Sequence, residues 1–75
     1  MTPALPVVSG AEVVRASGKV GFERVGQRGS HVKLRHADGR TVIVPMHREL
    51  ARGTLRSIFR QADFSAEEFA ELLLL

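Results

Sequence analysis

The stretch RGSHVKLR, residues 28–35, combines a histidine with two basic side chains at alternating positions. If this stretch is a β-strand, His31, Lys33 and Arg35 point to one face, because successive side chains of a strand alternate between its two faces. Imidazole is the side chain best suited to proton transfer near neutral pH, and cations beside it can bind an anionic group. The pattern therefore suits acid–base chemistry on an anionic substrate. A lone strand histidine is, however, more often a surface or structural residue.

The sequence holds two further histidines and no cysteine. His36 falls at the core-side phase of its predicted strand, next to a turn, so we expect it to be hydrogen-bonded and structural. His47 follows Pro45 and is expected to shape a connection; it is the second candidate for an active-site contact, because a strand end can lie near a bound substrate. The lack of cysteine excludes disulfides and thiolate zinc sites. We expect no metal and no other cofactor.

Basic residues are concentrated in the middle of the chain. All 11 Lys and Arg residues lie between Arg15 and Arg60, a segment with few acids, and the whole chain carries a net charge of +3. A polyanionic partner fits this distribution, and a solvated basic surface that only aids solubility fits it equally well. The row formed by Arg52, Arg56 and Arg60 is most simply a solvated helix face, and its alternative is a track for phosphates.

Two capping-box patterns and two apolar stripes predict three helices. Ser9 and Glu12 have the S-x-x-E spacing that satisfies free backbone N–H groups at a helix start. This first helix should end near residues 17–18, where a glycine can close it. Ser65 and Glu68 repeat the capping-box spacing. The stripes of the second and third helices are Leu55, Ile58, Phe59 and Ala62, and then Phe69, Leu72 and Leu73.

Residues 20–45 form short segments separated by glycines, which predicts three antiparallel strands. Asp38-Gly39 is the stronger turn signal, and a two-residue turn there sets Leu34 opposite Ile43. Directly opposed residues share a face of the sheet. The predicted core face holds Val32, Leu34, Thr41 and Ile43, and the predicted open face holds His31, Lys33, Arg35, Val42 and Val44.

The pairing of the first two predicted strands is less regular. Counting outward through Arg28-Gly29 would set Glu23 opposite Leu34, so we expect a bulge or a longer turn there. Pro45 should end the sheet, because proline cannot donate a ladder hydrogen bond.

The predicted order α-β-β-β-α-α forms a small two-layer α+β sandwich, with helices over one sheet face and the other face open. We expect the 75 residues to form a single domain, with residues 1–8 as a flexible N-terminal extension and residues 66–75 as an extra C-terminal helix. The sequence shows neither a signal-peptide pattern nor an apolar run of membrane-spanning length. We therefore expect a cytoplasmic protein with no membrane partner.

Four sequence elements occur in order: GF at Gly21-Phe22, RGSH at Arg28–His31, VPMH at Val44–His47 and GTLRSIFRQA at Gly53–Ala62. This set, over roughly residues 9–64, resembles the HicA-type mRNA interferase toxins of type II toxin–antitoxin systems. The resemblance implies a fold similar to double-stranded-RNA-binding domains, α-β-β-β-α, and an endoribonuclease that cleaves mRNA until a HicB-type antitoxin binds it. It also implies that His31 is the catalytic residue, with Gly29 and Ser30 shaping its turn.

The residues themselves suit metal-independent RNA cleavage. The 2′-hydroxyl of RNA can attack the adjacent phosphate when a base removes its proton and cations offset the charge of the phosphorane. His31 would be that base. We expect RNA contacts from Arg28, Gly29, Ser30, Lys33, Arg35 and His47. No second acid–base group is obvious in the sequence, so we expect modest turnover or protonation of the leaving oxygen by water.

We therefore expect a sequence-tolerant ribonuclease toxin whose partners are mRNA and an acidic HicB-type antitoxin that covers the open face. Two alternatives remain. The first is a non-catalytic RNA-binding module of the same fold, which would share the basic face and cut nothing. The second is a protein-interaction domain whose basic surface serves only protein contacts.

Overall fold

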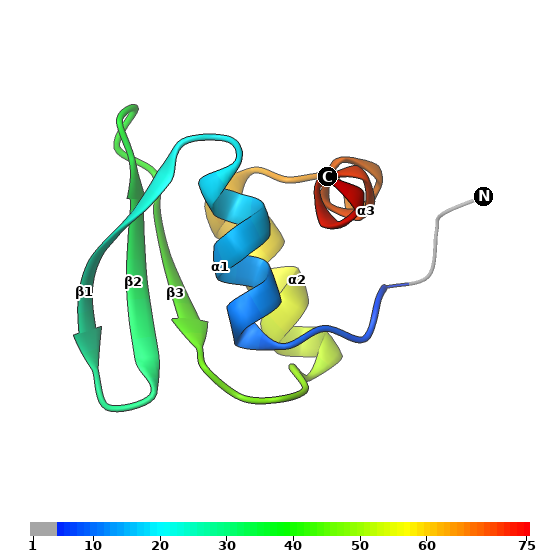
Figure 1. The fold of residues 1–75 in the computed structure, drawn as a ribbon, viewed down its shortest axis with the longest axis horizontal. Coiled ribbons are helices and arrows are strands. Elements are labelled where there is room, and N and C mark those ends of the chain that lie inside the picture. The colour runs from blue at the N-terminus through cyan, green and yellow to red at the C-terminus, as the bar shows by residue number, and fades with distance from the viewer. Residues whose placement is uncertain (1–4) are drawn as a thin grey trace.

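The computed structural model describes residues 5–75, and its elements follow the order predicted from the sequence, α-β-β-β-α-α (Figure 1). The elements are α1 (Gly10–Gly18), β1 (Phe22–Arg28), β2 (His31–His36), β3 (Thr41–Pro45), α2 (Arg52–Ala62) and α3 (Ala66–Leu74). The strands form one antiparallel sheet in the order β1-β2-β3. The α+β class is therefore confirmed.

Both predicted capping boxes are present at the starts of α1 and α3. The Ser9 hydroxyl accepts from the Glu12 backbone N–H at 3.1 Å, and the Glu12 carboxylate accepts from the Ser9 N–H at 3.0 Å. Ser65 and Glu68 make the same two bonds at 3.0 Å each. These bonds satisfy N–H groups that no helical carbonyl can reach, so each helix begins where its sequence signal predicted.

The helices lie on one side of the sheet and leave its other face open. Figure 1 shows α1 and α2 against the sheet, and α3 beyond them on the side away from the strands. The predicted stripe of α2 is buried in full: Leu55, Ile58, Phe59 and Ala62. The ring of Phe69 on α3 is fully buried and packs on Phe59 with 4.9 Å between ring centroids. The third helix thus belongs to the same core.

The β2–β3 register differs by one residue from the sequence prediction. Leu34 pairs with Val42 rather than with Ile43. Val42 and Val44 are fully buried under the helices, and Ile43 is 41% exposed on the open face with Thr41. The prediction that Thr41 and Ile43 face the core and that the two valines face outward is therefore wrong. A one-residue slip moves every side chain of a strand to the other face.

The slip has its origin in the turn. The hairpin loop contains three residues, 37–39, and not two, because the His36 N–H donates to the Arg40 carbonyl at 2.9 Å and the Gly39 N–H donates back to the His36 carbonyl at 2.9 Å. Gly39 has φ +98°, a conformation that glycine adopts without strain. Such three-residue loops with a left-handed glycine are a common hairpin connection.

The β1–β2 pairing contains the expected bulge. The register shifts between Arg24 and Gly26, and Glu23 consequently lies opposite Arg35 on the open face. The turn itself is short, since Arg28 pairs directly with His31. The bulge absorbs the extra residue of β1, so that Glu23 and Arg28, on either side of it, both lie opposite open-face residues of β2.

The segment before α1 packs onto the domain as far as it is described. Val8 is 3% exposed, and its carbonyl accepts from the Leu50 N–H at 2.8 Å. The end of the expected flexible extension over residues 1–8 is thus part of the core. Residues 1–4 of that expectation lie outside the described residues.

Candidate active site on the open sheet face

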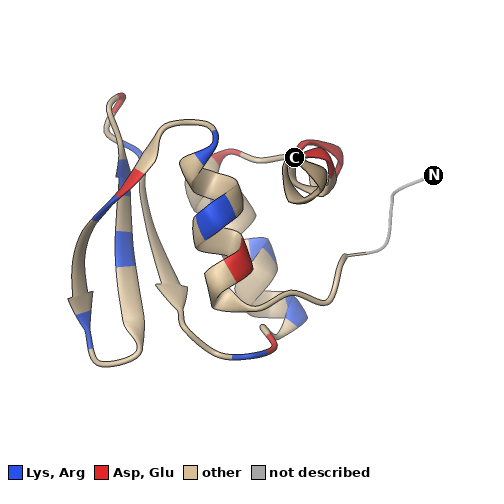
Figure 2. Ribbon diagram, viewed as in Figure 1, with Lys and Arg blue, Asp and Glu red and all other residues tan. Residues whose placement is uncertain are grey.

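Strand β2 turns its polar side chains to the open face, as predicted. His31, Lys33 and Arg35 are exposed, whereas Val32 and Leu34 between them are 0% and 1% exposed. Figure 2 shows basic segments along β1 and β2 on this side of the molecule and acidic segments on α3. The buried pair anchors the strand, so the alternation that stabilises the sheet also presents the histidine and the cations to one surface.

Three of the predicted site residues line one shallow hollow of about 400 Å³ at the end of the sheet. Its lining consists of Gly26, Gln27, Arg28, His31, Lys33 and Ile43. Arg28 reaches it because it is the direct cross-strand partner of His31. Ile43 adds an apolar wall because of the observed register. An imidazole and two cations therefore border a space that can admit an anionic group.

The turn before His31 is held by backbone bonds. Gly29 adopts φ +58°, which allows the reversal between β1 and β2. The Gln27 side-chain amide donates to the Gly29 carbonyl at 3.0 Å. The Ser30 carbonyl accepts from the Met46 N–H at 2.6 Å, which extends the β2–β3 pairing beyond Pro45. Gly29 and Ser30 thus position His31 through the backbone.

His47 lies beside His31. The two ring centroids are 6.4 Å apart, the ring planes are inclined by 74°, and both residues are exposed. The bond between Ser30 and Met46 connects the residues directly before each histidine. On the other side, the His47 carbonyl accepts from the Gly10 N–H at 2.9 Å, at the start of α1. The GSH turn and the VPMH segment are therefore direct neighbours, although His47 does not line the hollow of His31.

The RGSH and VPMH elements thus lie side by side in the fold. A comparison with known families identifies the family of the chain. The model of the family described as HicA toxin of bacterial toxin-antitoxin matches residues 10–64. The chain belongs to the HicA toxin family. It is accordingly a toxin of a toxin–antitoxin system. No protein in the search of curated proteins matches this chain. Helix α3 follows the matched region.

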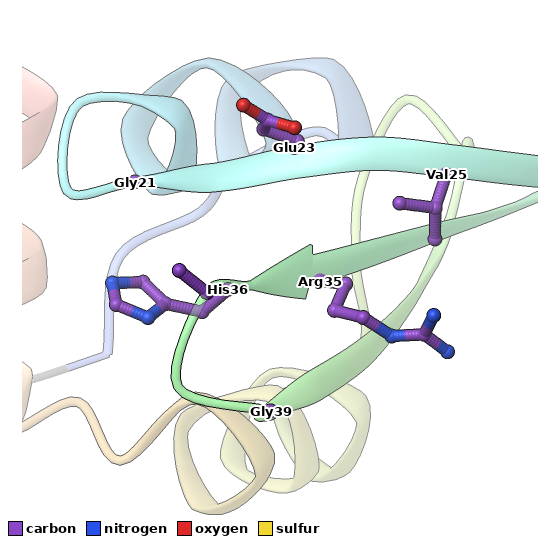
Figure 3. A pocket seen from close by; sticks show the side chains of 7 residues that line it. Gly21, Glu23, Val25, Arg35, His36 and Gly39 are labelled. Carbon is purple, nitrogen blue, oxygen red and sulfur yellow. The ribbon is translucent and has the colours of Figure 1, made fainter.

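Arg35 of this HicA-family chain lies on the predicted face but at a second hollow. That hollow, about 300 Å³, is lined by Gly21, Glu23, Val25, Arg35, His36, Ala37 and Gly39. Figure 3 shows these residues around the start of β1 and the end of β2. The structure therefore separates Arg35 from the hollow of His31 while keeping both on the open face. Glu23, opposite Arg35, places a carboxylate on the otherwise basic strand pair.

His36 has the structural role expected from the sequence. Its Nδ1 accepts from the Asp38 N–H at 3.1 Å, and its Nε2 lies 3.0 Å from the Val20 carbonyl oxygen. Because Nδ1 accepts, Nε2 carries the proton and donates to that carbonyl. The ring also packs edge-on against Phe22, with 5.2 Å between centroids. These contacts fix the ring at the hairpin and leave it no free nitrogen.

Two basic residues serve helix ends rather than the open face. Lys19 donates to the Leu72 carbonyl at 2.6 Å and also to the Leu75 carbonyl, at the end of α3. Desolvation, and then the charge of Arg15, lower the pKa of Lys19. Arg40 donates to the Ala62 carbonyl at the end of α2. Cations at helix C-termini stabilise the free carbonyls there.

Within residues 5–75, no three His, Cys, Asp or Glu side chains lie together as metal ligands would. None of the helices in that range is long and apolar enough to cross a membrane.

Sequence reasoning missed Ile43 as a lining residue of the His31 hollow, and it named His47 as a candidate contact without predicting that the two rings are neighbours. Ile43 was missed because a two-residue turn was assumed at Asp38-Gly39. The correct register could have been found by comparing the two possible faces of the strand. Val42 and Val44 are both apolar and make a better core face than a pair containing Thr41.

Proposed function

We propose that this HicA-family toxin is an endoribonuclease that cleaves mRNA, with His31 as the base that takes the proton of the 2′-hydroxyl. The observation that carries the proposal is the hollow in which the exposed His31 imidazole lies with Arg28 and Lys33. Imidazole exchanges protons near neutral pH, and general base catalysis of this kind contributes about 10²–10⁴-fold to a rate.

The reaction requires little beyond these groups. The nucleophile belongs to the substrate, so no enzyme hydroxyl, metal-bound water or cofactor has to supply it. Attack of the 2′-oxygen on phosphorus gives a 2′,3′-cyclic phosphate and releases the 5′-oxygen of the next nucleotide. Arg28 and Lys33 would bind the phosphate and offset the charge that builds up on its oxygens.

The partner that silences the toxin is, in this proposal, an acidic HicB-type antitoxin that covers the open face. An acidic surface would meet the exposed cations of β1 and β2, and burial of His31 would exclude RNA. Co-expression of such a protein should restore growth. Lys33→Glu in the toxin should weaken binding of the antitoxin. Arg56→Glu on the exposed side of α2 should not, because α2 lies on the other side of the sheet.

The test of the activity is inducible expression of the wild type, His31→Ala and the control Arg56→Ala, with growth and RNA integrity followed over time. Purified proteins are then assayed on RNA in the presence of EDTA. The wild type and the control should arrest growth and cleave RNA without metal. His31→Ala should cleave at least about 10²-fold more slowly and should not arrest growth.

Each other outcome has a defined meaning. Full toxicity of His31→Ala would show that His31 is not the base. Loss of cleavage in EDTA would overturn the metal-independent mechanism. RNA binding without cleavage would favour an RNA-binding module, and the absence of both activities would favour a protein-interaction domain.

A further inference from the structure

The proposed cleavage requires a second proton transfer. When the bond between phosphorus and the 5′-oxygen breaks, an alkoxide leaves unless a proton reaches that oxygen. A positioned acid accelerates such a step by about 10²–10⁴-fold. The sequence offered no obvious group for this task, and water was the expected donor. The structure brings a second imidazole beside His31, with 6.4 Å between the ring centroids.

We propose that His47 is the general acid that protonates the leaving 5′-oxygen. The inference rests on the proposed ribonuclease function and names the partner of His31 in that reaction. It assigns to His47 a direct role in bond cleavage, beyond the phosphate contact expected from the sequence.

The separation of the rings fits this assignment. In an in-line displacement, the attacking and leaving oxygens lie on opposite sides of phosphorus. Each catalytic nitrogen works at about 2.6–3.2 Å from its own oxygen, so the two imidazoles must both reach one bound phosphate. The centroids of His31 and His47 are 6.4 Å apart, and the rings meet at 74° rather than stacking. Both rings are exposed, so a phosphodiester bound across them from the solvent side can present one oxygen to each.

Both rings are available for proton transfer. His31 and His47 are exposed, and within residues 5–75 the hydrogen bonds of histidine rings belong to His36. His36, with both nitrogens engaged, is a structural histidine in the same protein. The contrast supports a different role for the two exposed rings.

The backbone on both sides of the His47 side chain is hydrogen-bonded. Met46, directly before His47, donates its N–H to the Ser30 carbonyl, directly before His31. The His47 carbonyl is in turn held by the Gly10 N–H. These two bonds fix the backbone of His47 between the turn before β2 and the start of α1. Catalytic groups do require such fixed positions.

The proton balance closes over one turnover. His31 begins neutral and takes the 2′-hydroxyl proton as the 2′-oxygen bonds to phosphorus. His47 begins protonated and gives its proton to the 5′-oxygen as the bond from phosphorus to that oxygen breaks. The products are a 2′,3′-cyclic phosphate and a 5′-hydroxyl. Proton exchange with water then restores a neutral His31 and a protonated His47.

The experiment uses two RNA substrates that differ in one atom at the phosphate that is cleaved. One has the natural 5′-oxygen as leaving atom, and the other has sulfur there. A thiolate leaves without protonation, so a variant that lacks only the general acid should recover on the sulfur substrate. Purified wild type, His47→Ala, His47→Gln and His31→Ala are assayed on both, and their circular dichroism and thermal melting show that they are folded.

We expect both His47 variants to cleave the oxygen substrate at least about 10²-fold more slowly than the wild type, and the sulfur substrate within about tenfold of it. His31→Ala should be slow on both substrates. If the cleavage rates of the His47 variants fall equally on both substrates, the inference is overturned and His47 binds the phosphate instead. If these variants cleave the oxygen substrate at the wild-type rate, His47 has no role in the reaction. A wild type that cleaves neither substrate would instead refute the ribonuclease function, and the role of His47 with it.

Discussion

Gly10 approaches Pro45 so closely that no side chain fits between them. A Cβ added at position 10 would lie 2.1 Å from the Pro45 carbonyl oxygen, a distance at which the backbone must move. The Gly10 N–H meanwhile donates to the His47 carbonyl. The start of α1 therefore packs directly on the end of β3, two residues before His47, the proposed general acid.

Gly10→Ala should consequently lower both stability and cleavage. We expect the free energy of unfolding to fall by about 1–3 kcal/mol, the usual range for overpacking, as measured by urea denaturation. Cleavage by the folded variant should also fall, because the shift displaces His47. The matched control is Gly18→Ala in the same helix, where an added Cβ meets nothing within 4 Å. It should be neutral or slightly stabilising. A Gly10→Ala protein as stable as Gly18→Ala would contradict the close approach.

The corrected register can be tested with two neighbouring residues of β3. Val42 is fully buried and Ile43 is 41% exposed. Val42→Ala should therefore lower the free energy of unfolding by about 2 kcal/mol, through lost burial and a cavity. Ile43→Ala should change it by less than about 1 kcal/mol, although it removes the larger side chain. The register predicted from a two-residue turn requires the reverse order, so urea denaturation of the two variants decides between them.

The salt dependence of RNA binding should identify the binding face. Each cation that neutralises a phosphate adds about 0.9 or less to the slope of log affinity against log salt concentration. Lys33→Ala should therefore weaken binding and reduce the slope by somewhat less than one unit, as measured by titration at several salt concentrations. Arg56→Ala on α2 should leave both unchanged. A loss of slope at Arg56 as well would instead support the arginine row on α2 as a phosphate track.

The hairpin between β2 and β3 should make stability sensitive to acid. The Arg40 N–H donates to Asp38 at 3.0 Å, and the Arg40 guanidinium forms an ion pair with the same carboxylate at 2.8 Å. The backbone bond from Arg40 first, and then the hydrogen bond and charge of the Arg40 side chain, hold the pKa of Asp38 below its ordinary 3.8. A depressed folded-state pKa stabilises the fold above the unfolded value, and this stabilisation is lost as pH falls through the folded value.

Asp38→Asn should remove that acid-sensitive contribution. The melting temperature of the wild type should exceed that of the variant at pH 6, and the difference should shrink as pH falls below 3.8. Asparagine keeps an oxygen that can accept from the Arg40 N–H and adopts turn conformations readily, so the comparison isolates the charge. A difference that stays constant down to pH 2 would argue against the pKa shift.

Much of the fold was predictable because its signals are local. Ser9 with Glu12, and Ser65 with Glu68, fix helix starts through bonds between residues three apart. The apolar spacing of α2 reports its buried face for the same reason. The β2–β3 register was not predictable from its turn signal alone, because Asp38-Gly39 suits both a two-residue and a three-residue loop. The choice between these loops depends on whether the helices bury Val42 and Val44 or Thr41 and Ile43.

The sequence by itself determined that His31, Lys33 and Arg35 share the open face, since the alternation of a strand with a buried Val32 allows no other arrangement. Only the tertiary structure decided that His47 lies beside His31. Their approach depends on the bond from Met46 to Ser30 and on the Gly10 contact with the end of β3. These contacts join segments that are distant in the chain, and such contacts form only when the sheet and the helix layer pack together.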